Sequence, residues 1–178
     1  MIETTPSALP AREEHQRYEA IWQRVSPSLT PYPAVPAEQP CRAGGEREAE
    51  LLCAFLQDEL ADAQTYRCLA ALAPSAEGRR LMRRLASDEQ AHAKRLQAAY
   101  FLLTGGCCRV TVVLPPQPRL LWRDRLRERY REECRGAARY ESAAGETADV
   151  CLSRLLLSLS ADEYRHAEAL REHLSNTL

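Results

Sequence analysis

The sequence predicts an all-α fold, a four-helix bundle made of two similar helical hairpins that one long connection joins. Three observations support this prediction. From Glu46 onward, apolar residues recur at the spacing of about 3.6 residues that places them on one face of a helix. Prolines and glycines interrupt this pattern where turns are needed. The second half of the helical region also repeats the first at an offset of 74 residues.

Composition limits the function classes that the chain can belong to. The 178 residues are 45% hydrophobic and 28% charged, with a net charge of −1, which suits one soluble domain with a buried core. Near-neutral, interleaved charge gives no reason to expect a nucleic acid or an acidic membrane surface as a partner. We find no apolar run of about 18 residues and no basic start before an apolar segment, so neither a membrane span nor a secretory signal is expected.

Residues 1–45 differ from the rest of the chain. Residues 11–25 have a pattern that could form a short helix, and the following SPSLTPYPAVPAEQP predicts a proline-rich extended arm. Because Tyr32 and Val35 are apolar, this arm is expected to pack on the body or on a neighbouring subunit, with disorder as the alternative. The predicted division is an arm over residues 1–45 and a bundle over residues 46–178.

Four helices are expected in the bundle, over residues 46–72, 75–103, 119–144 and 147–174. Pro74 ends the first helix, because proline cannot continue one. The sequence TGG ends the second and Gly145 ends the third, since glycine is common just after a helix. Thr147 is the expected N-cap of the fourth helix.

The connection between the second and third helices is long. Residues 105–118 have no helical pattern, and they overlap the β-like sequence RVTVV. Fourteen extended residues reach about 45 Å, and a helix of about 27 residues is about 40 Å long. This connection can therefore run the length of the bundle, while the other two turns are short.

A Glu-x-x-His motif occurs twice, in LASDEQAHAKRL (residues 85–96) and in LSADEYRHAEAL (residues 159–170). The same offset relates DELADAQTYRCLA (residues 58–70) to EECRGAARYESAA (residues 132–144). The matching pairs are Glu59 with Glu133, Tyr66 with Tyr140, Glu89 with Glu163, and His92 with His166. We therefore predict an internal duplication of a helical hairpin, whose shared polar residues are candidates for one site.

These polar residues interrupt the apolar stripes of the helices, so they are expected to point into the bundle. In the third helix the predicted inward stripe is Leu126, Tyr130, Glu133, Ala137 and Tyr140. Burying four carboxylates costs many kcal/mol unless their charge is cancelled, and two divalent cations would cancel it. One Glu from each of two helices with a Glu-x-x-His from each of the other two is the donor set of dinuclear sites in bundle cores. Protonated glutamates or internal salt bridges in a purely structural core are the alternative.

On these residues the sequence resembles the ferritin-like superfamily of di-iron carboxylate proteins, in particular bacterioferritins and rubrerythrins, over about residues 46–174. The resemblance implies a ferritin-like bundle that binds two metal ions per chain, iron or alternatively manganese. It implies that Glu89 and Glu163 bridge the two ions. The implied terminal ligands are Glu59 with His92 for one ion and Glu133 with His166 for the other.

The resemblance also implies roles for residues around the ligands. Asp88 and Asp162 would each orient the histidine of the opposite hairpin, and solvated helix acids are the alternative. Tyr66 and Tyr140 would donate hydrogen bonds to the ligand carboxylates, and core tyrosines with satisfied hydroxyls are the plain alternative.

The sequence departs from these families in two respects. It has no C-x-x-C, so the rubredoxin-like domain of rubrerythrins is not expected, and it lacks the short fifth helix of cage ferritins. A homodimer is therefore expected in place of a storage shell. Cys107 and Cys108, with Cys41, could form a redox pair that replaces the missing relay; loop thiols without a role are the alternative.

The other thiols and histidines have simpler interpretations. We expect four cysteines within helical patterns to be reduced, in a reducing cytoplasm: Cys53, Cys68, Cys134 and Cys151. His15 and His173 have no counterpart in the repeat and are expected at the surface.

The function that these inferences predict is a cytoplasmic di-iron oxidoreductase, peroxidase-like or ferroxidase-like, acting in oxidative stress. It would oxidise Fe(II) while hydrogen peroxide or O2 is reduced, and an electron donor that the sequence does not identify would restore it. A manganese catalase-like enzyme and a non-enzymatic iron-binding or iron-sensing module are the alternatives.

Overall fold

The computed structural model describes residues 45–112 and 120–176. They form four helices, α2 (Glu46–Leu72), α3 (Ala76–Thr104), α4 (Trp122–Glu146) and α5 (Val150–Ser175). No strand occurs in these two ranges, and the described part of the β-like sequence, residues 109–112, is irregular. The predicted all-α class and its four helices are therefore confirmed.

The chain divides into two units, Met1–Pro40 and Cys41–Leu178, and all four helices belong to the second. The predicted short helix and proline-rich arm, with His15 and Cys41, lie outside the described residues and stay predictions. Among the helices that the structure describes, none combines the length and apolar character needed to cross a lipid bilayer.

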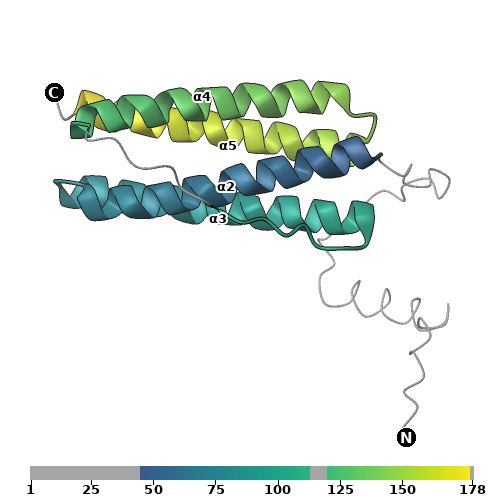
Figure 1. The fold of residues 1–178 in the computed structure, drawn as a ribbon. Helices are drawn as coiled ribbons and strands as arrows, with labels where there is room; N and C mark the ends of the chain where they lie inside the picture. The colour runs from purple at the N-terminus through teal and green to yellow at the C-terminus, as the bar shows by residue number, and fades with distance from the viewer. Residues whose placement is uncertain (1–44, 113–119, 177–178) are drawn as a thin grey trace, which may run out of the picture. The chain divides into compact units, whose positions relative to one another are not determined.

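The helices pair as two antiparallel hairpins, α2 with α3 and α4 with α5 (Figure 1). The turn of the first hairpin and the turn of the second lie at opposite ends of the bundle. Consequently α3 ends at one end of the bundle and α4 begins at the other, so the connection between them has to span its length, as predicted. Between the hairpins, the backbones come close only where α3 faces α5.

Short polar side chains fix where α3 and α5 begin. The Ser75 hydroxyl accepts a hydrogen bond from the Gly78 N–H over 3.0 Å, which caps α3. The prediction of Thr147 as N-cap of α5 is wrong. Asp149 caps that helix, because its carboxylate accepts from the N–H groups of Cys151 and Leu152 and its negative charge suits a helix N-terminus.

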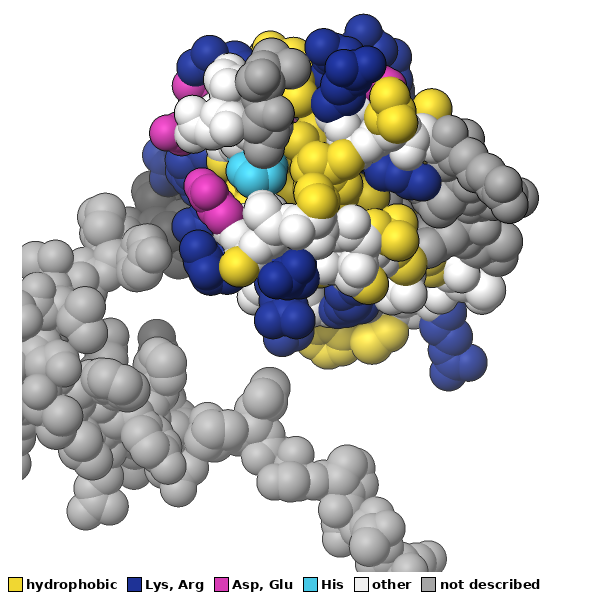
Figure 2. Space-filling model, turned by 90° about the vertical axis from the view of Figure 1, so that its left-hand side faces the viewer, with side chains coloured by type: hydrophobic (Ala, Val, Ile, Leu, Met, Phe, Trp, Pro, Cys, Tyr) yellow, Lys and Arg dark blue, Asp and Glu magenta, His cyan; other side chains and the backbone are white. Residues whose placement is uncertain are grey.

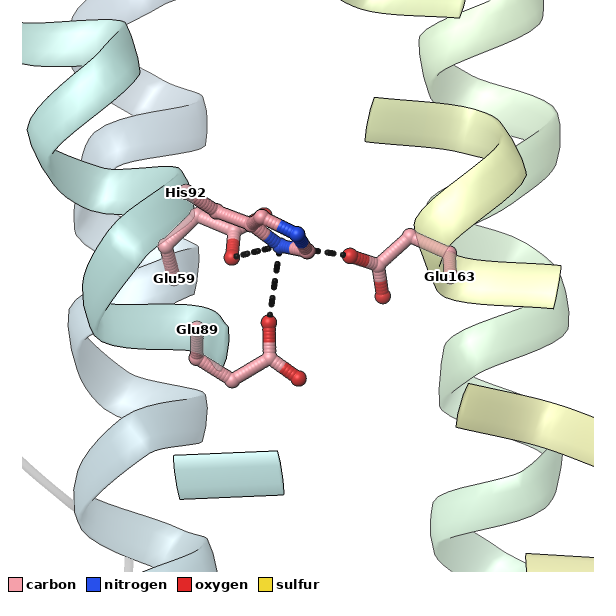
Figure 3. Close-up of side chains that lie close together, drawn as sticks. All are labelled: Glu59, Glu89, His92 and Glu163. Atoms are coloured by element: carbon pink, nitrogen blue, oxygen red, sulfur yellow. Dashed lines mark hydrogen bonds and ion pairs between the residues drawn. The ribbon is translucent and has the colours of Figure 1, made fainter. Parts of the chain in front are cut away.

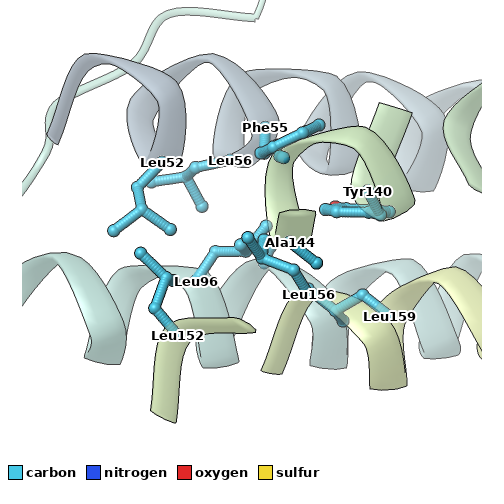
Figure 4. Close-up of a cluster of buried hydrophobic side chains, with 11 residues drawn as sticks. Leu52, Phe55, Leu56, Leu96, Tyr140, Ala144, Leu152, Leu156 and Leu159 are labelled. Carbon is cyan, nitrogen blue, oxygen red and sulfur yellow. The ribbon is translucent and has the colours of Figure 1, made fainter. Parts of the chain in front are cut away.

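Two apolar clusters divide the core along the bundle axis. The first contains Leu52, Phe55, Leu56, Ala93, Leu96, Tyr140, Ala143, Ala144, Leu152, Leu156 and Leu159 (Figure 4). The second contains Tyr66, Leu69, Ala70, Leu81, Met82, Leu85, Ala86, Leu126 and Leu170. Each helix contributes to both clusters, and on every helix the repeated Glu or His positions lie between the two. The polar residues thus form a layer with apolar packing above and below.

A disulfide joins Cys53 on α2 to Cys108 in the connection after α3, with Cα atoms 5.9 Å apart. The prediction that Cys53 is a reduced thiol is therefore wrong, and Cys108 is bonded to Cys53 and not to Cys107. Neighbouring residues have Cα atoms only about 3.8 Å apart, whereas disulfides favour about 5.5–6 Å, so Cys53 is the better placed partner. Cys107 is an exposed free thiol. Cys108 and Val110 also pack on the first apolar cluster.

His173 is 5% exposed, so its predicted surface position is wrong. It follows His166 by seven residues, two helical turns, and therefore lies on the same inward face of α5. Gly78 makes room for it, because a Cβ there would lie 3.1 Å from the His173 Nε2 atom. Figure 2 shows the end of the bundle where the α2–α3 turn lies, with a histidine among hydrophobic side chains and Lys or Arg around them.

Replacing Cys53 with serine is expected to destabilise the fold. The disulfide closes a loop across a sequence separation of 55 residues, which in the chain-entropy treatment corresponds to about 4 kcal/mol. The melting temperature under non-reducing conditions should fall by roughly 10 °C. Cys107→Ser is the matched control and should melt like the wild type; equal melting of Cys53→Ser and wild type would contradict the role of the disulfide.

Candidate metal centre

Six buried side chains from all four helices meet between the two apolar clusters. They are Glu59 from α2, Glu89 and His92 from α3, Glu133 from α4, and Glu163 and His166 from α5. They form two groups, Glu59–Glu89–His92–Glu163 and Glu89–Glu133–Glu163–His166. Within each group, one ligand atom per residue lies within 4.8 Å of the others. Each group could therefore hold a metal ion.

In the first group three carboxylates surround one ring nitrogen of His92 (Figure 3). The Nδ1 atom lies 3.2 Å from Glu59 Oε2 and 3.1 Å from Glu89 Oε2. On the other side it lies 3.1 Å from Glu163 Oε1, a residue of the opposite hairpin. Carboxylates of α2, α3 and α5 thus converge on a single imidazole.

The second group repeats this arrangement around His166. Its Nδ1 atom lies 3.1 Å from Glu89 Oε1 and 3.3 Å from Glu133 Oε2. Glu163 Oε2 is 4.0 Å away. The two imidazole rings stack with their centroids 5.4 Å apart, so the groups are direct neighbours.

The four glutamates have two kinds of position. Glu89 and Glu163 belong to both groups, and each presents one carboxylate oxygen to His92 and the other to His166. Glu59 faces only His92, and Glu133 faces only His166. Two shared carboxylates and two terminal ones match the donor arrangement of dinuclear sites in bundle cores.

Tyrosines from the opposite hairpin hold the two terminal glutamates. The Tyr140 hydroxyl on α4 donates a hydrogen bond to Glu59 Oε1 on α2. In the same way Tyr66 on α2 donates to Glu133 Oε1 on α4. Each tyrosine therefore fixes one carboxylate oxygen and leaves the other facing a histidine.

Aspartates lie beside the outer nitrogen of each histidine, in the crossed pairing that the resemblance implies. Asp162 Oδ2 is 3.3 Å from His92 Nε2, and Asp88 Oδ2 is 3.6 Å from His166 Nε2. When the ring is neutral, an aspartate that accepts a hydrogen bond from Nε2–H favours the tautomer in which the Nδ1 lone pair faces the glutamates. That lone pair is then available to a cation.

Arg129 is a buried residue of the site that the sequence interpretation missed. Its Nη2 atom donates to Glu133 Oε1 over 2.9 Å, and Nη1 lies 2.8 Å from Asp62 Oδ1. The predicted inward position of Tyr130 is wrong, since that side chain is 37% exposed whereas Arg129 is 9% exposed. The repeat offset was the usable signal, because it relates Arg129 to Phe55, a residue of the apolar stripe of α2.

Burial and close contacts move the pKa values of the site in opposite directions. Burial raises the pKa of Glu59 to about 8 against the opposing hydrogen bond with His92, and burial raises that of Glu163 to about 10. Burial lowers the pKa of the histidines, but carboxylate hydrogen bonds outweigh it and raise the pKa to about 11 at His92 and about 10 at His166. For Glu89, hydrogen bonds with both histidines outweigh burial, and its pKa is lowered.

The pKa of Glu133 is also lowered, because its hydrogen bond with His166 and the charge of Arg129 outweigh burial. In the metal-free protein at neutral pH, two imidazolium ions therefore balance the carboxylates of Glu89 and Glu133. The other two glutamates keep their protons. Protons thus take the place that divalent cations would fill.

Several buried atoms of the cluster have a charged neighbour in the site but no hydrogen bond of regular geometry within the described residues. They are Glu89 Oε1, Glu133 Oε2, Glu163 Oε1 and His166 Nδ1. All of them belong to residues of the two groups. Buried polar atoms normally have a partner, so oxygen and imidazole donors left in this state fit divalent cations.

A cavity of about 510 Å³ at the α2–α3 end of the bundle is separate from this cluster. Its lining includes Arg80, Arg84 and His173, and none of the six Glu and His residues takes part in it.

Comparisons with known protein families, curated proteins and solved structures found no match to this chain.

Metal-free protein is expected to lose stability as the pH rises from about 6 to about 9. The folded state holds protons on Glu163 and His92 with pKa values of about 10 and 11, against ordinary values of 4.5 and 6.5. The unfolded state therefore binds fewer protons, and the free energy of unfolding falls with pH. The melting temperature, measured at several pH values in the presence of a chelator, should fall by roughly 2–4 °C for each kcal/mol of stability lost.

The variant Glu163→Gln stays neutral at every pH, so its melting temperature should depend less on pH over the same range. A wild-type melting temperature that stays constant or rises would contradict the assigned protonation states.

Proposed function

We propose that this chain binds two adjacent metal ions in the manner of ferritin-like di-iron carboxylate proteins, and that it oxidises Fe(II) while hydrogen peroxide or O2 is reduced. The observation that carries the proposal is the sharing of Glu89 and Glu163 between the two histidines. One ion would be held by Glu59 and His92, and the other by Glu133 and His166, with the shared carboxylates between them.

Charge balance supports two divalent ions. Four carboxylates with two neutral imidazoles leave four negative charges in the interior, and isolated buried charges of that kind cost several kcal/mol each. Two divalent cations carry the matching positive charge. Arg129 contacts both Glu133 and Asp62, and because the charges of Arg129 and Asp62 cancel, the two together add no net charge to this sum.

The protein's own residues would fix the ligands before any ion arrives. Tyr66 and Tyr140 each hold one oxygen of a terminal glutamate, and the aspartates keep Nδ1 of each histidine free of a proton once the ring is neutral. The apolar clusters on both sides limit the access of water, which strengthens electrostatic interactions within the layer. Such a preorganised donor set needs little rearrangement on binding.

The chemistry would come from the metal. Bound iron would supply two electrons at one site, enough to reduce one molecule of hydrogen peroxide to water. Carboxylate and imidazole ligands suit iron and also manganese. The order of elements, two hairpins joined by a connection that spans the bundle, is the one that ferritin-like folds use.

Anaerobic titration of metal-stripped protein with Fe(II), followed by elemental analysis, should saturate at two irons per chain. Glu89→Ala should lose at least one of them, because Glu89 faces both histidines. Glu168→Ala is the matched control, since that glutamate is exposed and pairs with Arg171 on the surface of α5.

Adding peroxide or O2 to the loaded protein should then oxidise both irons. Absence of Fe(II) binding would refute the metal site, and binding without oxidation would refute the redox part of the proposal. Rapid disproportionation of peroxide by protein loaded with Mn(II) alone, with slow reaction of the iron form, would identify manganese as the metal.

A further inference from the structure

The metal centre has two halves, one at Glu59 and His92 and the other at Glu133 and His166. The side chains next to them differ at a position that the repeat makes equivalent. The offset of 74 residues relates Phe55 on α2 to Arg129 on α4. Both lie against a tyrosine that holds a terminal glutamate. The Phe55 ring stacks on Tyr140 with centroids 4.3 Å apart, and the Arg129 guanidinium lies 4.8 Å from the Tyr66 ring centroid. One half therefore has a neutral ring where the other has a cation.

The cation acts directly on a candidate ligand. Glu133 Oε1 accepts hydrogen bonds from both Tyr66 and Arg129. Its counterpart Glu59 Oε1 accepts one from Tyr140, whose ring stacks on the neutral Phe55. A charge-assisted hydrogen bond is about twice as strong as a neutral one. Glu133 is therefore the more firmly engaged of the two carboxylates, and its negative charge is already partly matched.

The two positions that form the ion pair of Arg129 with Asp62 are also specific to this half. Asp62 on α2 accepts from Arg129, and the offset relates Asp62 to Gly136 on α4, so neither partner has a counterpart. Asp62 keeps Arg129 directed at Glu133. The two halves therefore differ at both positions of this ion pair.

The aspartates beside the outer nitrogens of the histidines also differ between the halves, in their exposure and in their distance from the ring. Asp162, beside His92, is 14% exposed at its side chain and is held by Arg95 and Arg165. Asp88, beside His166, is 56% exposed and lies farther from its histidine. The orientation of His92 is thus better fixed than that of His166.

The geometry points to two unequal metal positions. The position at Glu59 and His92 binds a divalent cation more tightly and fills first. The position at Glu133 and His166 fills second, because Arg129 engages its terminal carboxylate. Arg129 is a positioning residue that sets the order of loading, and this inference rests on the proposed function.

Calorimetric titration of the metal-stripped full chain with Mn(II) tests the inference. Even in a symmetric site the second ion binds more weakly, because the first ion already neutralises part of the charge on the two shared carboxylates. The decisive comparison is therefore between the wild type and a variant. In the double variant Arg129→Phe/Asp62→Ala, which gives this half a neutral ring, the second dissociation constant should fall by about tenfold while the first is unchanged. At one equivalent, wild-type protein should show the EPR signal of isolated Mn(II), and the variant more of the coupled pair.

The other half supplies the matched control. Arg139 on α4 lies 5.1 Å from the Phe55 ring and pairs with Asp58 on α2, but it is exposed and touches no candidate ligand. Arg139→Phe/Asp58→Ala should bind Mn(II) like the wild type. Should the first double variant not fold, Arg129→Met/Asp62→Asn preserves side-chain volume and carries the same expectation.

Two histidine variants identify which position is tight. His92→Ala should lose the tight step, and His166→Ala the weak one. Three results would overturn the inference while leaving the two-metal site intact. The second dissociation constant could stay unchanged in both Arg129 variants, or it could fall equally in the Arg139 control. The third is loss of the tight binding step in His166→Ala. No Mn(II) binding by wild-type protein would instead refute the site itself, and the inference with it.

Discussion

The interior of this bundle holds more ionisable groups than an apolar core tolerates without compensation. Four glutamates and two histidines lie between two hydrophobic clusters, and every one of them is buried. Uncompensated carboxylates there would prevent folding, because each costs several kcal/mol to remove from water. The pairing of these groups with each other, with protons or with cations is therefore the condition on which the packing of all four helices depends.

The same groups hold the two hairpins together. The backbones of the hairpins approach closely only between α3 and α5, so α2 and α4 are connected through side chains. Tyr66 and Tyr140 form crossed hydrogen bonds between these helices, each to a glutamate of the other. Two ion pairs join the same helices, the buried Arg129 with Asp62 and the exposed Arg139 with Asp58. The polar layer thus joins the hairpins together with the two apolar clusters, and its carboxylates converge on the two histidines.

The four helices and the six Glu and His residues of the site could be predicted from the sequence, because the duplicated motif places equivalent residues at equivalent heights in two hairpins. The periodicity of apolar residues predicted the helices, and the 74-residue offset predicted that Glu89 and Glu163 lie in one layer. The stripe assigned Tyr130 to the interior in place of Arg129, since a pattern of apolar residues counts a tyrosine as core and an arginine as surface. Its hydrogen bond with Glu133, its ion pair with Asp62 and its contact with the Tyr66 ring compensate the burial of the arginine.

The Cys53–Cys108 disulfide could not be predicted for a different reason. It joins a helix to an irregular connection, and no periodicity relates the two. His173 was misjudged because it lacks a counterpart in the repeat, although its spacing from His166 already placed it on the inward face of α5.

Anomalous X-ray diffraction from crystals of the Mn(II)-loaded protein, collected near the manganese absorption edge, tests the central claim most directly. The account predicts two neighbouring peaks in the layer between the apolar clusters, one beside Glu59 and His92 and the other beside Glu133 and His166, with Glu89 and Glu163 contacting both. A single peak elsewhere on the surface, or no peak in the layer at saturating Mn(II), would contradict it. In that case protons alone would neutralise the buried glutamates.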